Sequence, residues 1–136
     1  MRWLLIILIS MSSLSHADIM LRKFNNLYCY DGDTCYVTID KTNTKIRLLE
    51  LDTPEISKPK CQQELDWGIE ARDFLNNSIV NAQSIKFQTN YDKDYFGRIL
   101  AYLIIDDENI SEVLISNKLG VIYIKNKKMD WCAVKR

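Results

Sequence analysis

Residues 27–55 read LYCYDGDTCYVTIDKTNTKIRLLELDTPE and predict three consecutive β-strands. Residues 27–30 and 35–39 are rich in aromatic and β-branched residues, which favour strands. The Asp-Gly-Asp sequence between them is typical of a hairpin turn. The third strand covers residues 45–51 and is stopped by Pro54, because proline has no backbone N–H to donate to a neighbouring strand.

After this segment the hydrophobic pattern alternates between helical and strand periodicity. Residues 64–80 carry apolar side chains at helical spacing and predict the main helix. The later elements are a strand around residues 85–87, a polar turn at 90–97, a strand at 99–105, and a helix at 111–118 ended by Gly120. Five short strands, one main helix and a short second helix predict an α+β fold, a five-stranded Greek-key β-barrel of the OB type.

The first 17 residues have the order of a secretory signal. Arg2 gives a basic start, residues 3–9 are an apolar run, and Ser15-His16-Ala17 has the small-x-small pattern of a cleavage site. We expect cleavage after Ala17, which leaves residues 18–136 as a single domain with a short basic C-terminal tail. The apolar run is too short to span a bilayer, which takes about 20 residues. We therefore expect an exported protein, periplasmic or secreted, without stable membrane association.

Charge and histidine content narrow the possible chemistry. Without the signal, 17 basic and 18 acidic side chains remain, so no overall charge attracts a polyanion. The chain's only histidine, His16, lies in the signal. Ser-His, Cys-His and histidine-bound zinc chemistry are therefore excluded. Catalysis must use carboxylates, arginine, lysine, tyrosine or a metal held by oxygen atoms.

Four cysteines on an exported chain predict two disulfides. Three pairings are possible, and we favour Cys29–Cys35 together with Cys61–Cys132. The second bond closes a loop of about 70 residues and is worth about 4 kcal/mol in the chain-entropy model. We expect this bond also to stiffen the loop that follows Glu55.

An acidic cluster occupies the segment that contains the predicted hairpin. Residues 31–55 hold six acidic and three basic side chains. If the hairpin and the third strand lie side by side, Asp33 and Asp52 can converge, and converging carboxylates share a proton or bind a cation. Oxygen ligands favour Ca²⁺ or Mg²⁺. Each piece alone also has a structural interpretation, as a turn, a helix cap or a surface charge.

Three motifs occur in order along the chain. Asp-Gly-Asp-Thr stands at 31–34, Arg-Leu-Leu-x-Leu-Asp-Thr-Pro-Glu at 47–55, and Phe-Gly-Arg-x-Leu-Ala-Tyr at 96–102. In these motifs the sequence resembles the staphylococcal nuclease (thermonuclease) family, an OB-fold family of nucleases. The likeness runs from about Leu27 to about Tyr123, and its middle motif is long and specific.

The resemblance implies a metal site and a water-directing group. Asp33 and Asp52 correspond to carboxylate ligands of Ca²⁺, with the main-chain carbonyl of Thr53 as a third ligand. Glu55 corresponds to the residue that positions or deprotonates the attacking water. A glutamate beside a metal-bound water can play this part without any imidazole.

The resemblance also implies the groups that hold the substrate. Arg47 and Arg98 correspond to the pair that grips the scissile phosphate, where guanidinium groups neutralise the charge that develops. Phe96 and Tyr123 correspond to aromatic substrate contacts. Phe96 stands where the family commonly has tyrosine, so its ring can stack on a base but cannot donate a hydrogen bond.

The function implied is that of an exported, monomeric, Ca²⁺-dependent nuclease that hydrolyses DNA and/or RNA with little sequence preference. The alternative is a catalytically silent OB-fold module that binds nucleic acid. A structural, partner-binding domain is a third possibility, but it leaves the acidic residues and arginines unexplained. Cleavage that a chelator abolishes separates the enzyme from the other two.

Overall fold

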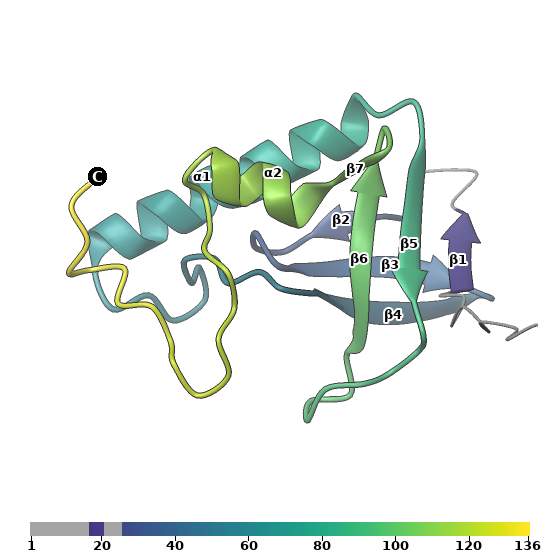
Figure 1. Cartoon of the computed structure of the whole chain (residues 1–136), viewed down its shortest axis with the longest axis horizontal. Coiled ribbons are helices and arrows are strands. Elements are labelled where there is room, and N and C mark those ends of the chain that lie inside the picture. The colour runs from purple at the N-terminus through teal and green to yellow at the C-terminus, as the bar shows by residue number, and fades with distance from the viewer. Residues whose placement is uncertain (1–16, 21–25) are drawn as a thin grey trace, which may run out of the picture.

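The computed structural model describes residues 17–20 and 26–136, which form seven strands and two helices (Figure 1). The strands are β1 Ala17–Met20, β2 Tyr28–Cys29, β3 Thr34–Ile39, β4 Thr42–Leu48, β5 Ile85–Thr89, β6 Ile99–Ile105 and β7 Glu108–Asn109, and the helices are α1 Gln62–Val80 and α2 Ile110–Ser116. The predicted signal lies outside the described residues except for Ala17, the first residue of β1.

Strand β6 joins two groups of strands into one sheet. It pairs antiparallel with β5 and parallel with β4, and the full order is β1-β5-β6-β4-β3-β2, with β7 also on β6. Figure 1 shows β5 and β6 crossing β3 and β4. The expected α+β fold of the OB type is confirmed. Strands β1 and β7 are additional to the five that the sequence predicted.

The third strand begins and ends earlier than predicted. Asp40 and Lys41 have φ values of 48° and 65° and form a two-residue turn, so β4 begins at Thr42. Such tight hairpin turns require positive φ at both central residues. The strand ends at Leu48 instead of residue 51, because the chain turns at Glu50, where φ is 58°.

Helix α1 begins two residues before the predicted start. Cys61 is its N-cap, and its Sγ accepts a hydrogen bond from the N–H of Glu64. This spacing is that of a capping box, with cysteine in place of serine or threonine. The prediction that Gly120 ends the second helix is wrong. Helix α2 ends at Ser116, with Asn117 as its C-cap.

The core lies between the sheet and the two helices. Its largest fully buried side chains include Phe87, Ile46 and Leu103 from the strands and Leu75 and Leu114 from the helices. Over residues 17–20 and 26–136, no helix is long and apolar enough to cross a membrane.

Both predicted disulfides are present. Cys29 is bonded to Cys35, and Cys61 to Cys132. The second bond ties the C-terminal segment to the start of α1, where Gln63 also donates hydrogen bonds to two main-chain oxygens of that segment, at 2.8 and 2.7 Å. The C-terminal residues therefore pack beside the loop that precedes α1.

Candidate active site

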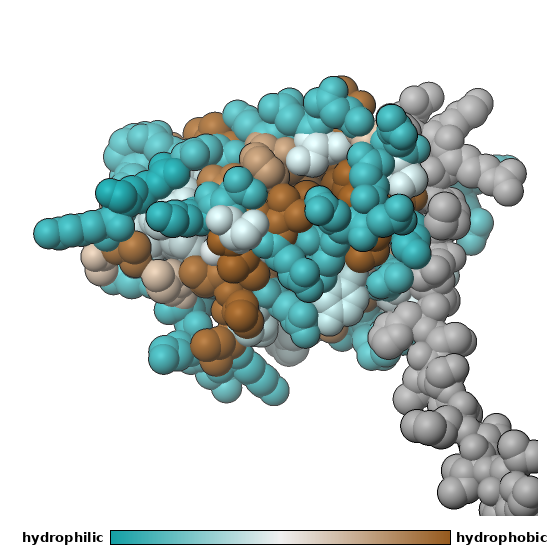
Figure 2. Space-filling view, turned by 45° about the horizontal axis from the view of Figure 1, so that its top comes forward, coloured by the Kyte–Doolittle hydropathy of each residue, from teal (hydrophilic) through white to brown (hydrophobic). Residues whose placement is uncertain are grey.

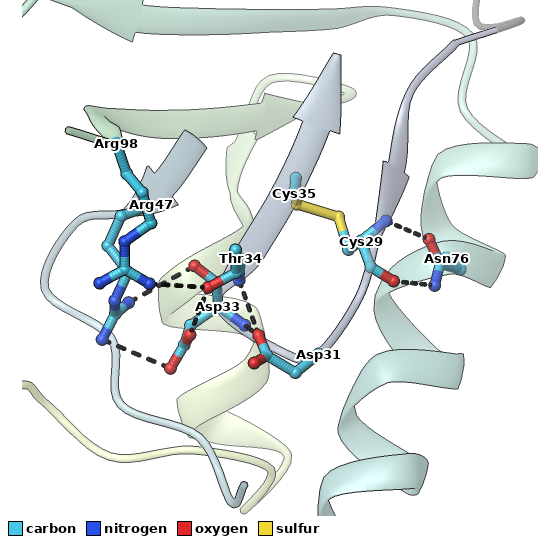
Figure 3. The surroundings of a disulfide bond; sticks show 8 residues. All are labelled: Cys29, Asp31, Asp33, Thr34, Cys35, Arg47, Asn76 and Arg98. Atoms are coloured by element: carbon cyan, nitrogen blue, oxygen red, sulfur yellow. Dashed lines mark hydrogen bonds and ion pairs between the residues drawn. A yellow bond between two sulfur atoms is a disulfide. The ribbon is translucent and has the colours of Figure 1, made fainter. Parts of the chain in front are cut away.

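The turn between β2 and β3 is fixed by hydrogen bonds and by a disulfide (Figure 3). The Asp31 carboxylate accepts hydrogen bonds from the N–H groups of Asp33 and Thr34, at 3.0 and 2.8 Å. The Cys29–Cys35 disulfide closes the base of the turn. Asn76 of α1 exchanges two hydrogen bonds of 2.9 Å with the backbone of Cys29. The turn is thus held to the helix as well as to the sheet.

Three of the chain's four glycines allow close approach to the segment 51–55. A Cβ atom at Gly32 would lie 2.7 Å from the Thr53 side chain. A Cβ at Gly68 or Gly120 would also come within 2.7 Å of an atom of this segment. Residues 51–55 are therefore in close contact with three segments: the turn between β2 and β3 (the acidic turn), α1, and the segment after α2. This role of the glycines was not predicted from the sequence.

Asp33 and Asp52 come together from the turn and from this segment. Asp33 accepts a hydrogen bond from the N–H of Thr53 at 3.1 Å and forms an ion pair with Arg47 at 3.4 Å. Both aspartates are buried. Burial and the charge of Asp33 raise the pKa of Asp52, and the positive charge of Arg47 opposes this rise. The convergence predicted for these two carboxylates is therefore present.

Asp31 adds a third acid to the site, and its role was not predicted from the sequence. Burial, followed by the charge of Asp33, raises the pKa of Asp31 to about 7. The carboxylate of Glu55 contributes to the same rise. Crowding of this kind favours binding of a cation, which would relieve the repulsion between the acids.

The donor set fits a hard cation. Within the described part of the chain, no group of three or more His, Cys, Asp or Glu side chains is arranged to hold a metal. The candidate ligands are instead two carboxylates, from Asp33 and Asp52, and the main-chain oxygen of Thr53. Thr53 Oγ1 is also buried without a hydrogen-bond partner among the described residues. Oxygen-only sites that leave positions for water or substrate are typical of Ca²⁺ and Mg²⁺.

The two candidate phosphate-binding arginines lie beside the acidic turn. Arg47 donates hydrogen bonds to the carbonyls of Leu48, at 2.8 Å, and Asp33, at 3.5 Å. Arg98 Nη1 donates to Thr34 Oγ1 at 3.2 Å. Figure 3 shows both guanidinium groups at the same end of the turn, away from the disulfide. Each guanidinium has five N–H donors, and these contacts use only some of them.

Asp94 holds Arg98 in place and was not predicted from the sequence. Its carboxylate accepts hydrogen bonds from Arg98 Nε at 2.7 Å and from the backbone N–H of Arg98 at 2.9 Å. Burial alone would raise the pKa of Asp94, but the hydrogen bonds and charge of Arg98 outweigh it and lower the pKa. The available signal in the sequence was an acid and a base four residues apart in a polar turn, Asp94 and Arg98.

Glu55 opens onto a cavity of about 230 Å³ that Asp52 and Thr53 also line. Its side chain is 38% exposed and pairs with Lys128 at 3.3 Å. The buried Glu64 accepts hydrogen bonds from the N–H groups of Glu55, at 3.5 Å, and Lys60, at 2.6 Å. Glu64 therefore holds the loop of residues 55–60 in place. Lys128, from the basic C-terminal tail, lies at the site through its ion pair with Glu55.

Aromatic rings flank the two arginines. The ring centre of Phe96 lies 5.5 Å from Arg98 Cζ, and that of Tyr123 lies 5.7 Å from Arg47 Cζ. Both rings are exposed. Figure 2 shows apolar side chains gathered at the surface near the loop that follows α2, where Tyr123 and its two isoleucine neighbours are exposed. The structure thus places both predicted substrate contacts beside the predicted phosphate-binding groups.

Comparison with known proteins gives a family match and several curated relatives. Residues 45–132 match the family described as staphylococcal nuclease homologue. An uncharacterized protein of Methanocaldococcus jannaschii is 33% identical over an alignment of 117 residues, and the match covers 71% of this chain and 56% of the relative. The SPbeta prophage-derived endonuclease YokF of Bacillus subtilis is 35% identical over an alignment of 106 residues, and the match covers 72% of this chain and 34% of the relative.

The thermonuclease of Staphylococcus hyicus is 34% identical over 90 residues, 66% of this chain and 53% of that protein. The chain thus spans between one third and just over half of the length of these relatives. The family match covers well over half of the chain, including the second half of β4, β5, β6, both helices and the 47–55 motif. The chain belongs to the staphylococcal nuclease family.

Proposed function

We propose that the protein is an exported, Ca²⁺-dependent nuclease that hydrolyses phosphodiester bonds of DNA and/or RNA with little sequence preference. The observation that carries this proposal is the convergence of Arg47 and Arg98 on the Asp33–Thr34 end of the turn. Two guanidinium groups can bind a phosphate diester, and the carboxylates beside them can bind a divalent cation. Neither kind of binding requires histidine. The nuclease names of the curated relatives support the same activity.

Asp33, Asp52 and the carbonyl of Thr53 would hold the metal. When bound, Ca²⁺ supplies positive charge that neutralises the non-bridging oxygens of the phosphate. The buried, mutually repelling acids support this assignment, as do the raised pKa values of Asp31 and Asp52. Arg47 neutralises part of the charge on Asp33 through their ion pair.

Arg47 and Arg98 bind the scissile phosphate and stabilise the charge that develops on it. Both side chains are largely buried, with 14% and 24% of their surfaces exposed. Partial burial strengthens a charge-assisted hydrogen bond, and the contacts to Asp33 and Asp94 fix the geometry in advance. Phe96 and Tyr123 stack on the bases next to that phosphate.

Glu55 positions the attacking water and accepts its proton. The cavity beside Glu55 admits water, and Asp52 and Thr53 line the same space. The water oxygen bonds to phosphorus while the bond to the 5′ oxygen breaks. The leaving 5′ oxygen takes a proton from solvent, so the products are a 3′-phosphate and a free 5′ hydroxyl.

Residues 1–17 act as a signal that is removed after Ala17, and residues 18–136 form the mature, monomeric domain. The two disulfides support an oxidising destination, the periplasm or the medium. N-terminal sequencing of protein recovered outside the cytoplasm tests this part of the proposal. A first residue of Asp18 is expected, and recovery of chains that still begin at Met1 contradicts cleavage.

The arginine assignment is tested by cleavage rates of purified variants. Arg47→Ala and Arg98→Ala should each lower kcat by about 10² to 10³, as does loss of one preorganised donor to a transition state. Arg72→Ala is the matched control, because Arg72 pairs with Asp73 on the exposed surface of α1. Equal rates for the wild type and both site variants contradict the assignment. Binding without cleavage by the wild type supports the silent OB-fold module instead.

A further inference from the structure

The outward face of β2, β3 and β4 carries side chains that lie next to Arg47 and Arg98. Tyr36 of β3 lies opposite Tyr28 of β2 and Lys45 of β4, and Thr34 lies opposite Arg47. Alternate residues of a strand point to the same side of the sheet. Tyr36 and Lys45 therefore share a face with Thr34 and Arg47, one step further along each strand.

Tyr28, Tyr36 and Lys45 form an ordered aromatic and cationic surface, which we name the stacking face. The tyrosine rings are stacked, with centroids 5.1 Å apart and planes 10° apart. Lys45 Nζ lies 5.4 Å from the centre of the Tyr36 ring. Tyr28 is 52% exposed. The opposite side of the same strands is the core, so these rings are not needed to fill it.

The chemistry of the stacking face fits unpaired nucleotides. Tyr36 lies between Tyr28 and Lys45, so the open aromatic face of the stack is the outer face of Tyr28. A base can stack on that face, and Lys45 offers a charge to a phosphate. Bases in a duplex have their faces covered by their neighbours, whereas those of a single strand are free to stack on protein.

We propose that the stacking face binds the part of a single-stranded substrate that extends beyond the scissile phosphate. This inference rests on the proposed function, which places that phosphate at Arg47 and Arg98. Thr34, which accepts a hydrogen bond from Arg98, is two residues from Tyr36, or about 7 Å along the strand. A nucleic-acid strand bound at the arginines can therefore continue along this face, with a phosphate beside Lys45 and a base stacked on Tyr28, whose ring Tyr36 supports. The substrate class is single-stranded or locally unpaired nucleic acid.

Binding can be tested apart from catalysis by fluorescence anisotropy of a labelled oligothymidylate of 12 nucleotides. The oxidised full chain is used, in excess chelator so that the DNA is not cleaved. Tyr28→Ala and Tyr36→Ala should each raise Kd about tenfold, and Tyr36→Phe should leave it unchanged because the ring remains. Lys45→Ala should flatten the slope of log Kd against log salt by about 0.7, the loss of one phosphate contact. Lys118→Ala, two residues after the end of α2, is the matched charge control and should change neither quantity.

The outcomes separate this proposal from the nuclease proposal. Unchanged Kd in both alanine variants overturns the stacking face even if the wild type cleaves DNA. Tyr36→Leu, which keeps an apolar side chain without a ring, replaces any alanine variant whose melting curve shows that it has not folded. Binding that depends on the tyrosines, without cleavage when Ca²⁺ is added, overturns the nuclease and supports the stacking face. Failure of the wild type to bind overturns the stacking face.

Discussion

Asp31 shows how the fold sets the charge of a single residue. Its carboxyl has an ordinary pKa of 3.8 in the unfolded chain, whereas burial and Asp33 raise the pKa to about 7 in the folded protein. Between these values the folded state binds more protons than the unfolded state. The free energy of unfolding of the metal-free protein therefore falls as the pH rises from about 4 to about 7.

Asp31→Asn should remove this pH dependence. Asparagine is neutral at every pH, and its side-chain oxygen can still accept hydrogen bonds from the backbone of the turn. Relative to the wild type, the variant should gain about 2 kcal/mol in free energy of unfolding between pH 4 and pH 8, less than the full shift implies because the group is partly exposed to solvent. Urea unfolding in chelator at both pH values measures the gain. An equal difference between the two proteins at both pH values contradicts the shift.

At the scale of elements, the site depends on how closely the acidic turn approaches residues 51–55. Gly32 permits that approach, since a Cβ atom there would meet the Thr53 side chain. The turn residues, the 47–55 motif and α1 can each be recognised separately in the sequence. Their contact through glycine cannot, because it depends on residues far apart in the chain.

Gly32→Ala should destabilise the protein by about 1–3 kcal/mol through overpacking. It should also weaken Ca²⁺ binding, because Asp33 moves away from Asp52. Gly97→Ala is the comparison. Gly97 has open space around it but a φ of +78°, so alanine should cost about 1–2 kcal/mol in stability and leave Ca²⁺ affinity unchanged. Calorimetric titration with Ca²⁺ and thermal melts measure both effects. Equal Ca²⁺ affinity in the wild type and Gly32→Ala contradicts the role given to Gly32.

The sequence predicts elements more fully than contacts between them. The apolar run at β6 and the hairpin of β2 and β3 follow from local patterns, and the motifs indicate the arginines and acids of the site. The end of β4 was missed because Glu50 adopts a positive φ that its residue type does not announce. Asp94 and Lys128 were missed because a turn acid and a tail lysine acquire roles only when folding brings them to Arg98 and Glu55.

At the scale of the whole molecule, two disulfides constrain the chain over very different distances. Cys29–Cys35 spans 6 residues and closes the acidic turn, whereas Cys61–Cys132 spans 71 and joins the C-terminal segment to the start of α1. Trp67 and Trp131 pack edge to face near the second bond, with ring centroids 4.9 Å apart. The long bond therefore restrains the unfolded chain more strongly than the short one.

Removing the long disulfide should cost more stability than removing the short one. In the chain-entropy model, Cys61→Ser with Cys132→Ser lowers the free energy of unfolding by about 4 kcal/mol, and Cys29→Ser with Cys35→Ser by about 2 kcal/mol. The second pair of substitutions should impair Ca²⁺ binding more, because its bond lies at the base of the turn that carries Asp33. Denaturant unfolding and Ca²⁺ titration of both variants measure these effects. The opposite order in stability contradicts the loop-length argument.

Metal-dependent cleavage by the whole protein tests the central claim most directly. The oxidised wild type is incubated with single-stranded DNA in Ca²⁺, then with excess chelator, and then with Ca²⁺ restored. We predict cleavage that stops with chelator and returns with Ca²⁺, leaving 3′-phosphate ends. Cleavage that continues unchanged in chelator, or no cleavage in Ca²⁺ by protein that binds the DNA, contradicts the assignment of a Ca²⁺-dependent nuclease.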